Sequence, residues 1–422
     1  MREMKDSGVE WIGEIPENWE VVPTKRFFRN VKRVVGNDVD NYERLALTMN
    51  GVIKRSKEDS EGLQPEKFEG YQILRKNELV FKLIDLENIR TSRVGLSSYT
   101  GLVSPAYIVL TNESDDNRFY YYWFMFLYYN EVFNHLGGNG VRSALNAKDL
   151  SIIPIVSIPT YMQNCIANHL DEKCRKINAI IAKQKEIIEK LKAYKMSFIN
   201  EAVNNDRGTK CHLGYVGTMK NGLNFSSTLD GKKIKFLGVG DFKDYFILND
   251  INMFSDIITI DKIPEEYMLK DGDIIFVRSN GSKELVGRAV MVKNIDYPLS
   301  YSGFCIRFRN ARPDIVDNSY LLYYFRSLDF RKELEKHSQG SNINNVNQEL
   351  LSQIDFTFPD IELQRKIVYI LEDKCKKIDT VICKKMKLID KLTTYKKSLI
   401  YEVVTGKKTC VYEKIGDMVE NE

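Results

Sequence analysis

The sequence has few of the residues from which metal centres and disulfide frameworks are built. Only four histidines occur in 422 residues, at positions 135, 169, 212 and 337, and they lack the short spacing of paired metal ligands. The seven cysteines include no C-x-x-C pair, which favours reduced thiols in a cytoplasm. We therefore predict no metal site and a cytoplasmic location.

Long apolar runs are also absent. The opening "MREMKDSGVEW" is charged and has no apolar core of a secretory signal. The most apolar stretch, "FYYYWFMFLYY" at 119–129, is far shorter than the roughly 20 residues that span a bilayer. We interpret it as a buried helix and expect no contact with a membrane.

An internal repeat dominates the chain instead. Shifting the sequence by 201 positions aligns 163–203 with 364–404, and 18 of these 41 positions are identical. The likeness continues more weakly outside, where "LRKNELVFK" at 74–82 parallels "LKDGDIIFV" at 269–277. Such a duplication indicates two variable domains, each followed by a better preserved helix. Cys174 and Cys375 are equivalent; a disulfide between them is conceivable, but packing between helices explains them better.

The repeated segment has the seven-residue periodicity of a coiled coil. With Leu170 and Leu371 at heptad position a, apolar side chains recur at positions a and d of both copies. The predicted seam consists of Ile177, Ile180, Ile187, Leu191 and Tyr194 in the first copy and Ile378, Val381, Leu388, Leu392 and Tyr395 in the second. We expect the helices to pair with each other; the alternative is that each stripe packs on its own domain.

The length of these helices predicts a spacer. Each helix, taken as about 38 residues, would extend roughly 57 Å at 1.5 Å per residue. If the two helices lie antiparallel, the duplicated domains would sit at opposite ends of the pair, related by a pseudo-two-fold axis.

The opening "DSGVEWIGEIPENWEVVPTKR" at 6–26 resembles that of the specificity subunits of type I restriction-modification systems. The order of parts is similar too: a variable domain, a long helix entered through a P…Q..I pattern, then both again. "NGLNFS" at 221–226 and "GSNINNVNQELLSQIDFTFP" at 340–359 are similar to recurring stretches of that family's target-recognition domains. The second domain lacks its own "EWIGEIP", and the linker at 204–220 differs from it, so its starting point stays open.

The resemblance implies a prokaryotic, non-catalytic DNA-binding subunit. In that family each target-recognition domain reads one half of a bipartite, asymmetric double-stranded DNA site. The paired helices set the gap between the halves and dock two methyltransferase (M) subunits, which motor-nuclease (R) subunits can join. The cofactors S-adenosylmethionine, ATP and Mg²⁺ belong to those partners, so none is expected on this chain.

The residues themselves agree with the absence of catalysis. The chain has no N-P-P-[FYW] or D-P-P-[FYW] motif of amine methylation and no G-x-x-x-x-G-K-[ST] loop for a triphosphate. Pro359-Asp360 followed by Glu372-Asp373-Lys374 matches a nuclease pattern whose carboxylates must converge on a metal. Because Glu372 and Lys374 fall inside the heptad helix, we expect no nuclease site.

The net charge of +4 is low for a dedicated DNA-binding protein. The segments 163–203 and 364–408 together carry +11, so the remainder of the chain carries −7. The target domains would therefore contact DNA through local loops rather than through one basic surface.

Four loops rich in Arg, Asn, Ser and Gly, at 87–93, 137–146, 277–283 and 338–347, are the candidates. Arg and Asn form paired hydrogen bonds to base edges in the major groove, although such clusters also occur as ordinary surface turns. The predicted DNA-binding residues are Asn88, Arg90, Ser92, Arg93, Asn139, Arg142, Ser143 and Asn146 in the first domain and Arg278, Asn280, Ser282, Gln339, Asn342, Asn345 and Asn347 in the second.

The expected fold is a tandem of α/β (α+β) target-recognition domains joined by two long helices that form an antiparallel coiled coil. Short strands are expected over 71–110 and 267–309, with helices near 119–136 and 318–336. The expected parts are a first domain at 1–158, a spacer helix at 159–206, a second domain at 207–357, a spacer helix at 358–410 and a tail at 411–422. Two other functions remain open, a scaffold without sequence-specific DNA recognition and a stand-alone methyltransferase or nuclease.

Overall fold

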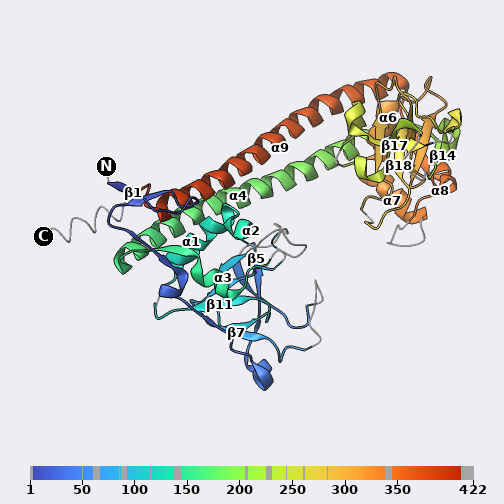
Figure 1. The fold of residues 1–422 in the computed structure, drawn as a ribbon. Helices are drawn as coiled ribbons and strands as arrows, with labels where there is room; N and C mark the ends of the chain where they lie inside the picture. The colour runs from blue at the N-terminus through green and yellow to red at the C-terminus, as the bar shows by residue number, and fades with distance from the viewer. Residues whose placement is uncertain are drawn as a thin grey trace. The chain divides into compact units, whose positions relative to one another are not determined.

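The computed structural model shows two compact units (Figure 1). The first consists of residues 1–184 and 387–422, and the second of residues 185–386. Each unit contains its own sheets and short helices, together with part of each of two long helices, α4 (Thr160–Val203) and α9 (Ile361–Val404). The structure describes residues 3–49, 51–59, 67–84, 86, 93–114, 116–136, 144–204, 208–224, 231–243, 245–259, 262–282, 284–337 and 345–409. The expected tail at 411–422 lies outside the described residues.

Two four-stranded sheets form the body of the first unit. Their strand orders are β6-β5-β10-β7 and β4-β11-β8-β9, and the pairs β1-β2 and β12-β3 lie beside them. The strands are β1 (Met4–Asp6), β2 (Glu14–Pro16), β3 (Glu20–Pro23), β4 (Arg29–Val31), β5 (Arg44–Thr48), β6 (Gly51–Arg55), β7 (Gln72–Leu74), β8 (Leu79–Phe81), β9 (Val94–Leu96), β10 (Gly101–Val103), β11 (Ile108–Thr111) and β12 (Pro154–Ser157). The helices, apart from α4 and α9, are η1 (Thr24–Arg26), η2 (Gly36–Asn41), α1 (Arg118–Tyr129), α2 (Val132–Leu136) and α3 (Ala147–Ile152).

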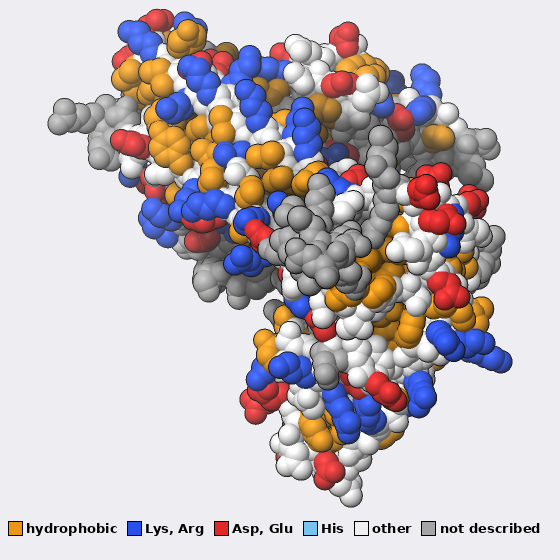
Figure 2. Space-filling model, turned by 90° about the vertical axis from the view of Figure 1, so that its left-hand side faces the viewer, with side chains coloured by type: hydrophobic (Ala, Val, Ile, Leu, Met, Phe, Trp, Pro, Cys, Tyr) orange, Lys and Arg blue, Asp and Glu red, His pale blue; other side chains and the backbone are white. Residues whose placement is uncertain are grey.

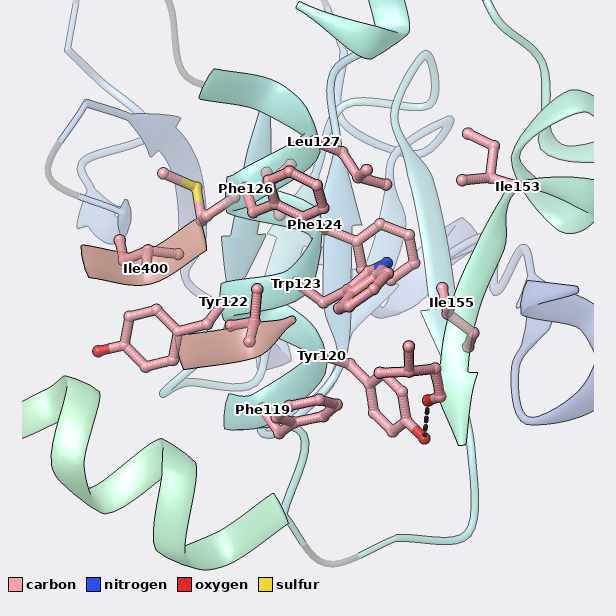
Figure 3. Packing of buried hydrophobic residues seen from close by; sticks show 14 of the residues in the cluster. Phe119, Tyr120, Tyr122, Trp123, Phe124, Phe126, Leu127, Ile153, Ile155 and Ile400 are labelled. Carbon is pink, nitrogen blue, oxygen red and sulfur yellow. Dashed lines mark hydrogen bonds between the residues drawn. The ribbon is translucent and has the colours of Figure 1, made fainter. Parts of the chain in front are cut away.

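The aromatic helix α1 forms the centre of the first core. Figure 3 shows Trp123 and Phe124 packed near Ile153 and Ile155 of the segment around β12, with Ile400 of α9 on another side. Trp123 and Phe124 are fully buried, and burying a side chain of this size stabilises a fold by about 1.5–3 kcal/mol. The prediction of a buried helix at 119–129 is confirmed. Among the described residues, no helix is long and apolar enough to cross a membrane.

The second unit repeats this plan with a five-stranded sheet, β14-β21-β18-β19-β16, and a three-stranded sheet, β17-β15-β20; β13 pairs with β22. The strands are β13 (Thr209–His212), β14 (Gly217–Asn221), β15 (Lys232–Leu237), β16 (Ile247–Leu248), β17 (Ser255–Thr259), β18 (Ile274–Val277), β19 (Ala289–Val292), β20 (Leu299–Tyr301), β21 (Cys305–Asn310) and β22 (Asp355–Phe358). The helices, apart from α4 and α9, are α5 (Leu213–Val216), η3 (Val239–Asp241), η4 (Ile251–Met253), η5 (Glu265–Tyr267), α6 (Asn318–Phe325), α7 (Leu328–His337) and α8 (Gln348–Gln353).

The strand pairings of the two units correspond. β5 pairs parallel with β10 and antiparallel with β6, as β15 does with β20 and β17. β3 pairs antiparallel with β12, as β13 does with β22. Thr24 donates its backbone N–H to Ile153 at 2.9 Å, and Leu213 donates its own to Ile354 at 3.0 Å. β13, which lies inside the linker at 204–220, therefore corresponds to β3 of the first unit.

The two long helices pack against each other in an antiparallel arrangement. In the first unit, Lys396 Nζ of α9 donates to Asn178 Oδ1 of α4 at 3.0 Å. In the second unit, Lys195 Nζ of α4 donates to both carboxylate oxygens of Asp379 in α9, at 2.8 and 2.6 Å. The beginning of α4 thus meets the end of α9, and the end of α4 meets the beginning of α9. The predicted antiparallel coiled coil is confirmed.

Most of the predicted d track is exposed, and the buried positions lie one residue further along each helix. Ile177, Ile187, Leu191, Ile378 and Leu392 are buried or half-buried as expected. Five members of the d track are 41–51% exposed: Ile180, Tyr194, Val381, Leu388 and Tyr395. The residues that follow the d track are buried or half-buried instead: Cys174, Ile181, Ile188 and Lys195 in α4 and Cys375, Ile382, Ile389 and Lys396 in α9. Both tracks contain isoleucines, so periodicity alone did not distinguish a step of three from a step of four.

The equivalent cysteines are packing residues. Cys174 and Cys375 are free thiols with 5% and 6% of their surface exposed, each within the core of its own unit. Burial raises the pKa of both thiols. Their burial in these cores supports the interpretation of both residues as packing positions.

Candidate nucleic-acid interface

Two predicted reading loops of the second domain lie side by side. The first begins where β18 ends, at Arg278, and the second leads into α8. Val346 donates its backbone N–H to the carbonyl oxygen of Arg278 at 2.9 Å, and Ser279 forms an isolated β-bridge with Asn345. Asn345 is exposed and Arg278 is half-buried. Segments about 65 residues apart in the chain thus form one surface, because β-type pairing holds them in register.

Two further segments, the turn at 302–304 and residues 221–224, complete this surface. In the turn at 302–304, Gly303 donates its backbone N–H to Leu223 O at 2.9 Å, and Phe304 O accepts the backbone N–H of Arg278 at 2.8 Å. A Cβ on Gly222 would lie 2.3 Å from Ser302 O, so this close approach requires glycine. In the sequence, the "NGLNFS" stretch at 221–226 points to the part of this surface formed by residues 221–224. We call the exposed or half-buried residues of these segments the Arg278 face: Asn221, Asn224, Arg278, Ser279, Phe304 and Asn345.

The electrostatics of the Arg278 face come from few groups. Arg278 Nη1 lies 3.5 Å from Gly303 O, which limits how far its guanidinium can move. The neighbouring Cys305 is buried, and burial raises the pKa of its thiol to about 12. The thiol therefore stays neutral and adds no negative charge beside Arg278. Asn280 uses its side-chain oxygen to accept the backbone N–H of Ser282 at 2.8 Å, which holds the turn between them.

Two predicted DNA-binding residues are helix caps. Asn146 accepts the backbone N–H groups of Lys148 and Asp149 at 2.8 and 3.1 Å and begins α3. Asn347 accepts the backbone N–H of Leu350 at 2.7 Å and begins α8. Paired bonding to adenine needs the side-chain oxygen, which the caps already occupy. Their recurrence in both domains reflects repeated helix starts, and their contact with DNA stays a prediction.

The burial of Arg93 contradicts its predicted contact with DNA. Its side chain is 1% exposed, and its guanidinium donates to the carbonyl oxygens of Ile84 at 3.3 Å and Leu86 at 2.6 Å. It holds the backbone that leads into the loop and cannot reach a base. The other predicted residues of these loops lie outside the described residues and stay predictions: Asn88, Arg90, Ser92, Asn139, Arg142, Ser143, Gln339 and Asn342.

The first domain has a different surface at the position of the Arg278 face. Leu145 donates its backbone N–H to Leu83 O at 2.9 Å, which matches the bond from Val346 to Arg278. Leu83, which is 1% exposed, therefore stands where the second domain has Arg278. Extending the strand register beyond its last pairs, Phe81 with Ile108 and Val277 with Cys305, aligns Ala106 with Phe304. A hollow of about 440 Å³ lies there, lined mainly by small and apolar residues such as Ala106 and Ala144, with Lys32 at its edge.

Positive charge is distributed locally. Over the lower part of the face shown in Figure 2, Lys and Arg side chains alternate with Asp and Glu side chains. A second hollow of the first unit, of about 460 Å³ near the start of α4, is lined by Lys25, Arg26 and Arg29 together with Glu113. Phosphate contact in this unit would therefore depend on small groups of cations, as the charge balance of the sequence predicts.

The nuclease-like pattern has no catalytic geometry. Asp360 accepts the backbone N–H of Leu363 at 2.9 Å and so caps α9. Asp373, within α9, forms an exposed ion pair with Lys377 at 2.6 Å. Among the described residues, no group of three or more His, Cys, Asp or Glu side chains could hold a metal ion.

Comparison with known proteins gives similarities to one family. The model of the type I restriction modification DNA specificity domain matches residues 208–391, which include the Arg278 face and most of α9. The chain is 26% identical over 298 residues to the type I restriction enzyme StySPI specificity subunit of Salmonella potsdam. It is 23% identical over 128 residues to the type I restriction enzyme EcoKI specificity subunit of Escherichia coli (strain K12). In residues 208–391 the chain is thus similar to the DNA specificity domain of type I restriction-modification systems.

The match to the specificity subunit from Salmonella potsdam covers 66% of this chain and 60% of that protein, and the match to the one from Escherichia coli covers 30% and 27%. A solved structure concerned with complex assembly and conformational transition of a type I R-M system contains a chain with the same fold. Its TM-score is 0.68 at 13% identity, with 92% of this chain and 98% of that chain covered. At this identity the likeness concerns the fold alone.

Proposed function

We propose that this chain is a non-catalytic specificity subunit. It would read a bipartite, asymmetric DNA site, one half with each target-recognition domain. The observation that carries the proposal is the chemical difference between two structurally equivalent surfaces. The second domain presents Arg278 and Phe304 at positions where the first has the buried Leu83 and the exposed Ala106. Two readers of one fold but different side chains would select two different half-sites. We assign the reading to the domains at 1–158 and 207–357.

The helices α4 and α9 would set the gap between the half-sites and dock two methyltransferase subunits. The exposed d track supports this role, because equivalent apolar side chains are exposed in both copies. Ile180 and Val381 are equivalent, as are Tyr194 and Tyr395, and all four are more than 40% exposed. Single exposed apolar side chains are common, but a duplicated set on a paired helix fits a duplicated partner. Motor-nuclease subunits, S-adenosylmethionine, ATP and Mg²⁺ would join through those partners in a prokaryotic cytoplasm.

The decisive experiment is a map of adenine methylation across the host genome, with and without this gene. We expect one bipartite motif to lose methylation when the gene is removed and to regain it when the gene is restored. An unchanged methylation map in a host that expresses the methyltransferase subunit would contradict the proposal and favour the scaffold function. Methylation by the purified chain alone, with S-adenosylmethionine, would contradict its non-catalytic nature.

A further inference from the structure

Phe304 is an exposed aromatic residue whose backbone is held in place from several sides. Its side chain is 54% exposed. Its carbonyl oxygen accepts the Arg278 backbone N–H at 2.8 Å, and its own N–H donates to Ser302 Oγ at 3.2 Å. The turn that carries it is bridged to the 221–224 segment by the pairing of Leu223 with Ser302. The ring is therefore presented on a rigid support.

Exposure of one phenylalanine would mean little by itself. Its significance comes from its neighbours, because Arg278 contacts its backbone and Asn345 is bridged to the residue after Arg278. Arg pairs with guanine edges, Asn with adenine edges, and an apolar side chain such as Phe contacts the methyl group of thymine in the major groove. The Arg278 face thus combines three kinds of side chain that read base pairs.

We propose that Phe304 packs against the 5-methyl group of a thymine in the half-site read by the second domain. The thymine belongs to a base pair adjacent to, or the same as, the one contacted by Arg278 or Asn345. This inference rests on the proposed function. The first domain has Ala106 at the equivalent position, so a thymine in its half-site would not be read by a ring at this place.

Deoxyuridine provides the probe, because it differs from thymidine only by lacking this methyl group. The assembled complex of the full-length chain with its methyltransferase subunits is titrated with duplexes that carry the methylated bipartite motif. Each thymine of the two half-sites is replaced by deoxyuridine, one at a time. We expect one replacement in the second half-site to weaken binding about fourfold, the factor for withdrawing one methyl-sized group from an apolar contact.

Three variants test whether Phe304 causes this sensitivity. Phe304→Ala should bind the thymine and deoxyuridine duplexes equally well, whereas Phe304→Leu should keep part of the preference. Tyr245→Ala removes another exposed aromatic of the second unit, 41% exposed, and should keep the full preference. Circular dichroism and thermal unfolding establish that each variant is folded and assembled.

The outcomes separate this inference from the proposed function. If the wild-type complex selects its motif but no replacement in the second half-site matters, or if that half-site contains no thymine, Phe304 does not read a methyl group. A uniform loss of affinity in Phe304→Ala, with the deoxyuridine effect retained, overturns the inference as well. If the wild-type complex does not distinguish its motif from other DNA at all, the proposed function itself is wrong.

Discussion

Lys195 and Asp379 form in the second unit the contact that Lys396 and Asn178 form in the first. The ammonium of Lys195 lies 2.6 and 2.8 Å from the two carboxylate oxygens of Asp379, and that of Lys396 lies 3.0 Å from Asn178 Oδ1. Both residues of one contact are displaced by 201 positions from those of the other. The duplication thus repeats a single side-chain contact. The lysine contacts a charged carboxylate in the second unit and a neutral amide in the first.

This asymmetry predicts opposite effects of two substitutions. Asp379→Asn should destabilise the chain by about 0.2–1 kcal/mol, because an ion pair near the surface becomes a neutral hydrogen bond. Asn178→Asp should stabilise it by a similar amount by creating the missing ion pair. The measurement is urea unfolding at low and at high salt. Both effects should shrink at high salt; effects of equal sign would show that the two contacts are not equivalent.

The corrected seam predicts a contrast between two isoleucines of α4. Ile188→Ala should cost about 2–5 kcal/mol, because it leaves a cavity at a buried position, where Ile188 is only 6% exposed. Ile180, at 45% exposed, is the matched control, and Ile180→Ala should change the free energy of unfolding by less than about 0.5 kcal/mol.

The same control variant tests the docking role of the exposed track. Ile180→Ala should weaken the association with methyltransferase subunits, measured by titration of the purified subunit, while the fold stays intact. Equal stability of Ile188→Ala and Ile180→Ala would contradict the corrected seam. Undiminished assembly of Ile180→Ala together with Tyr194→Ala would contradict docking on this track.

The division of labour between domains predicts modular specificity. Replacing residues 20–150 by the corresponding segment of another specificity subunit should change one half of the methylated motif and leave the other half and the gap unchanged. Methylation sequencing of a host that carries the hybrid gene gives the answer directly. If both halves change, the domains do not read independently.

Arg278 is predicted to read a base rather than a phosphate. Arg278→Ala should cost about 1–3 kcal/mol of binding to the intact site and relax the preference at one base pair. Lys220→Ala, in strand β14 of the same sheet, is the control: Lys220 is paired with Glu266 at 2.6 Å and should matter little. Binding of the assembled complex to single-base variants at two salt concentrations tests this. A uniform loss across all sequences, with a smaller salt slope, would identify a phosphate contact instead.

Substitution of Asn345 separates the two reading loops. Asn345→Ala should relax the preference at a different base pair from Arg278→Ala, because Asn345 lies on the opposite side of the bridge with Ser279. The double variant should lose both preferences. If neither single variant alters affinity or base preference, the second domain reads DNA through another surface.

The sequence by itself determined the duplication, the buried aromatic helix and the two long helices, because each depends on a local or periodic pattern. The sequence also indicated the loops of Arg278 and Asn345 as candidate DNA-binding segments, because Arg, Asn and Gly cluster there. Tertiary packing decided which of two adjacent apolar tracks is buried, because Ile180 and Ile181 satisfy the pattern equally well. Only the fold showed that Asn146 caps a helix and that the guanidinium of Arg93 donates hydrogen bonds to backbone carbonyl oxygens. The same holds for Phe304, whose place beside Arg278 depends on hydrogen bonds between segments that are distant in the chain.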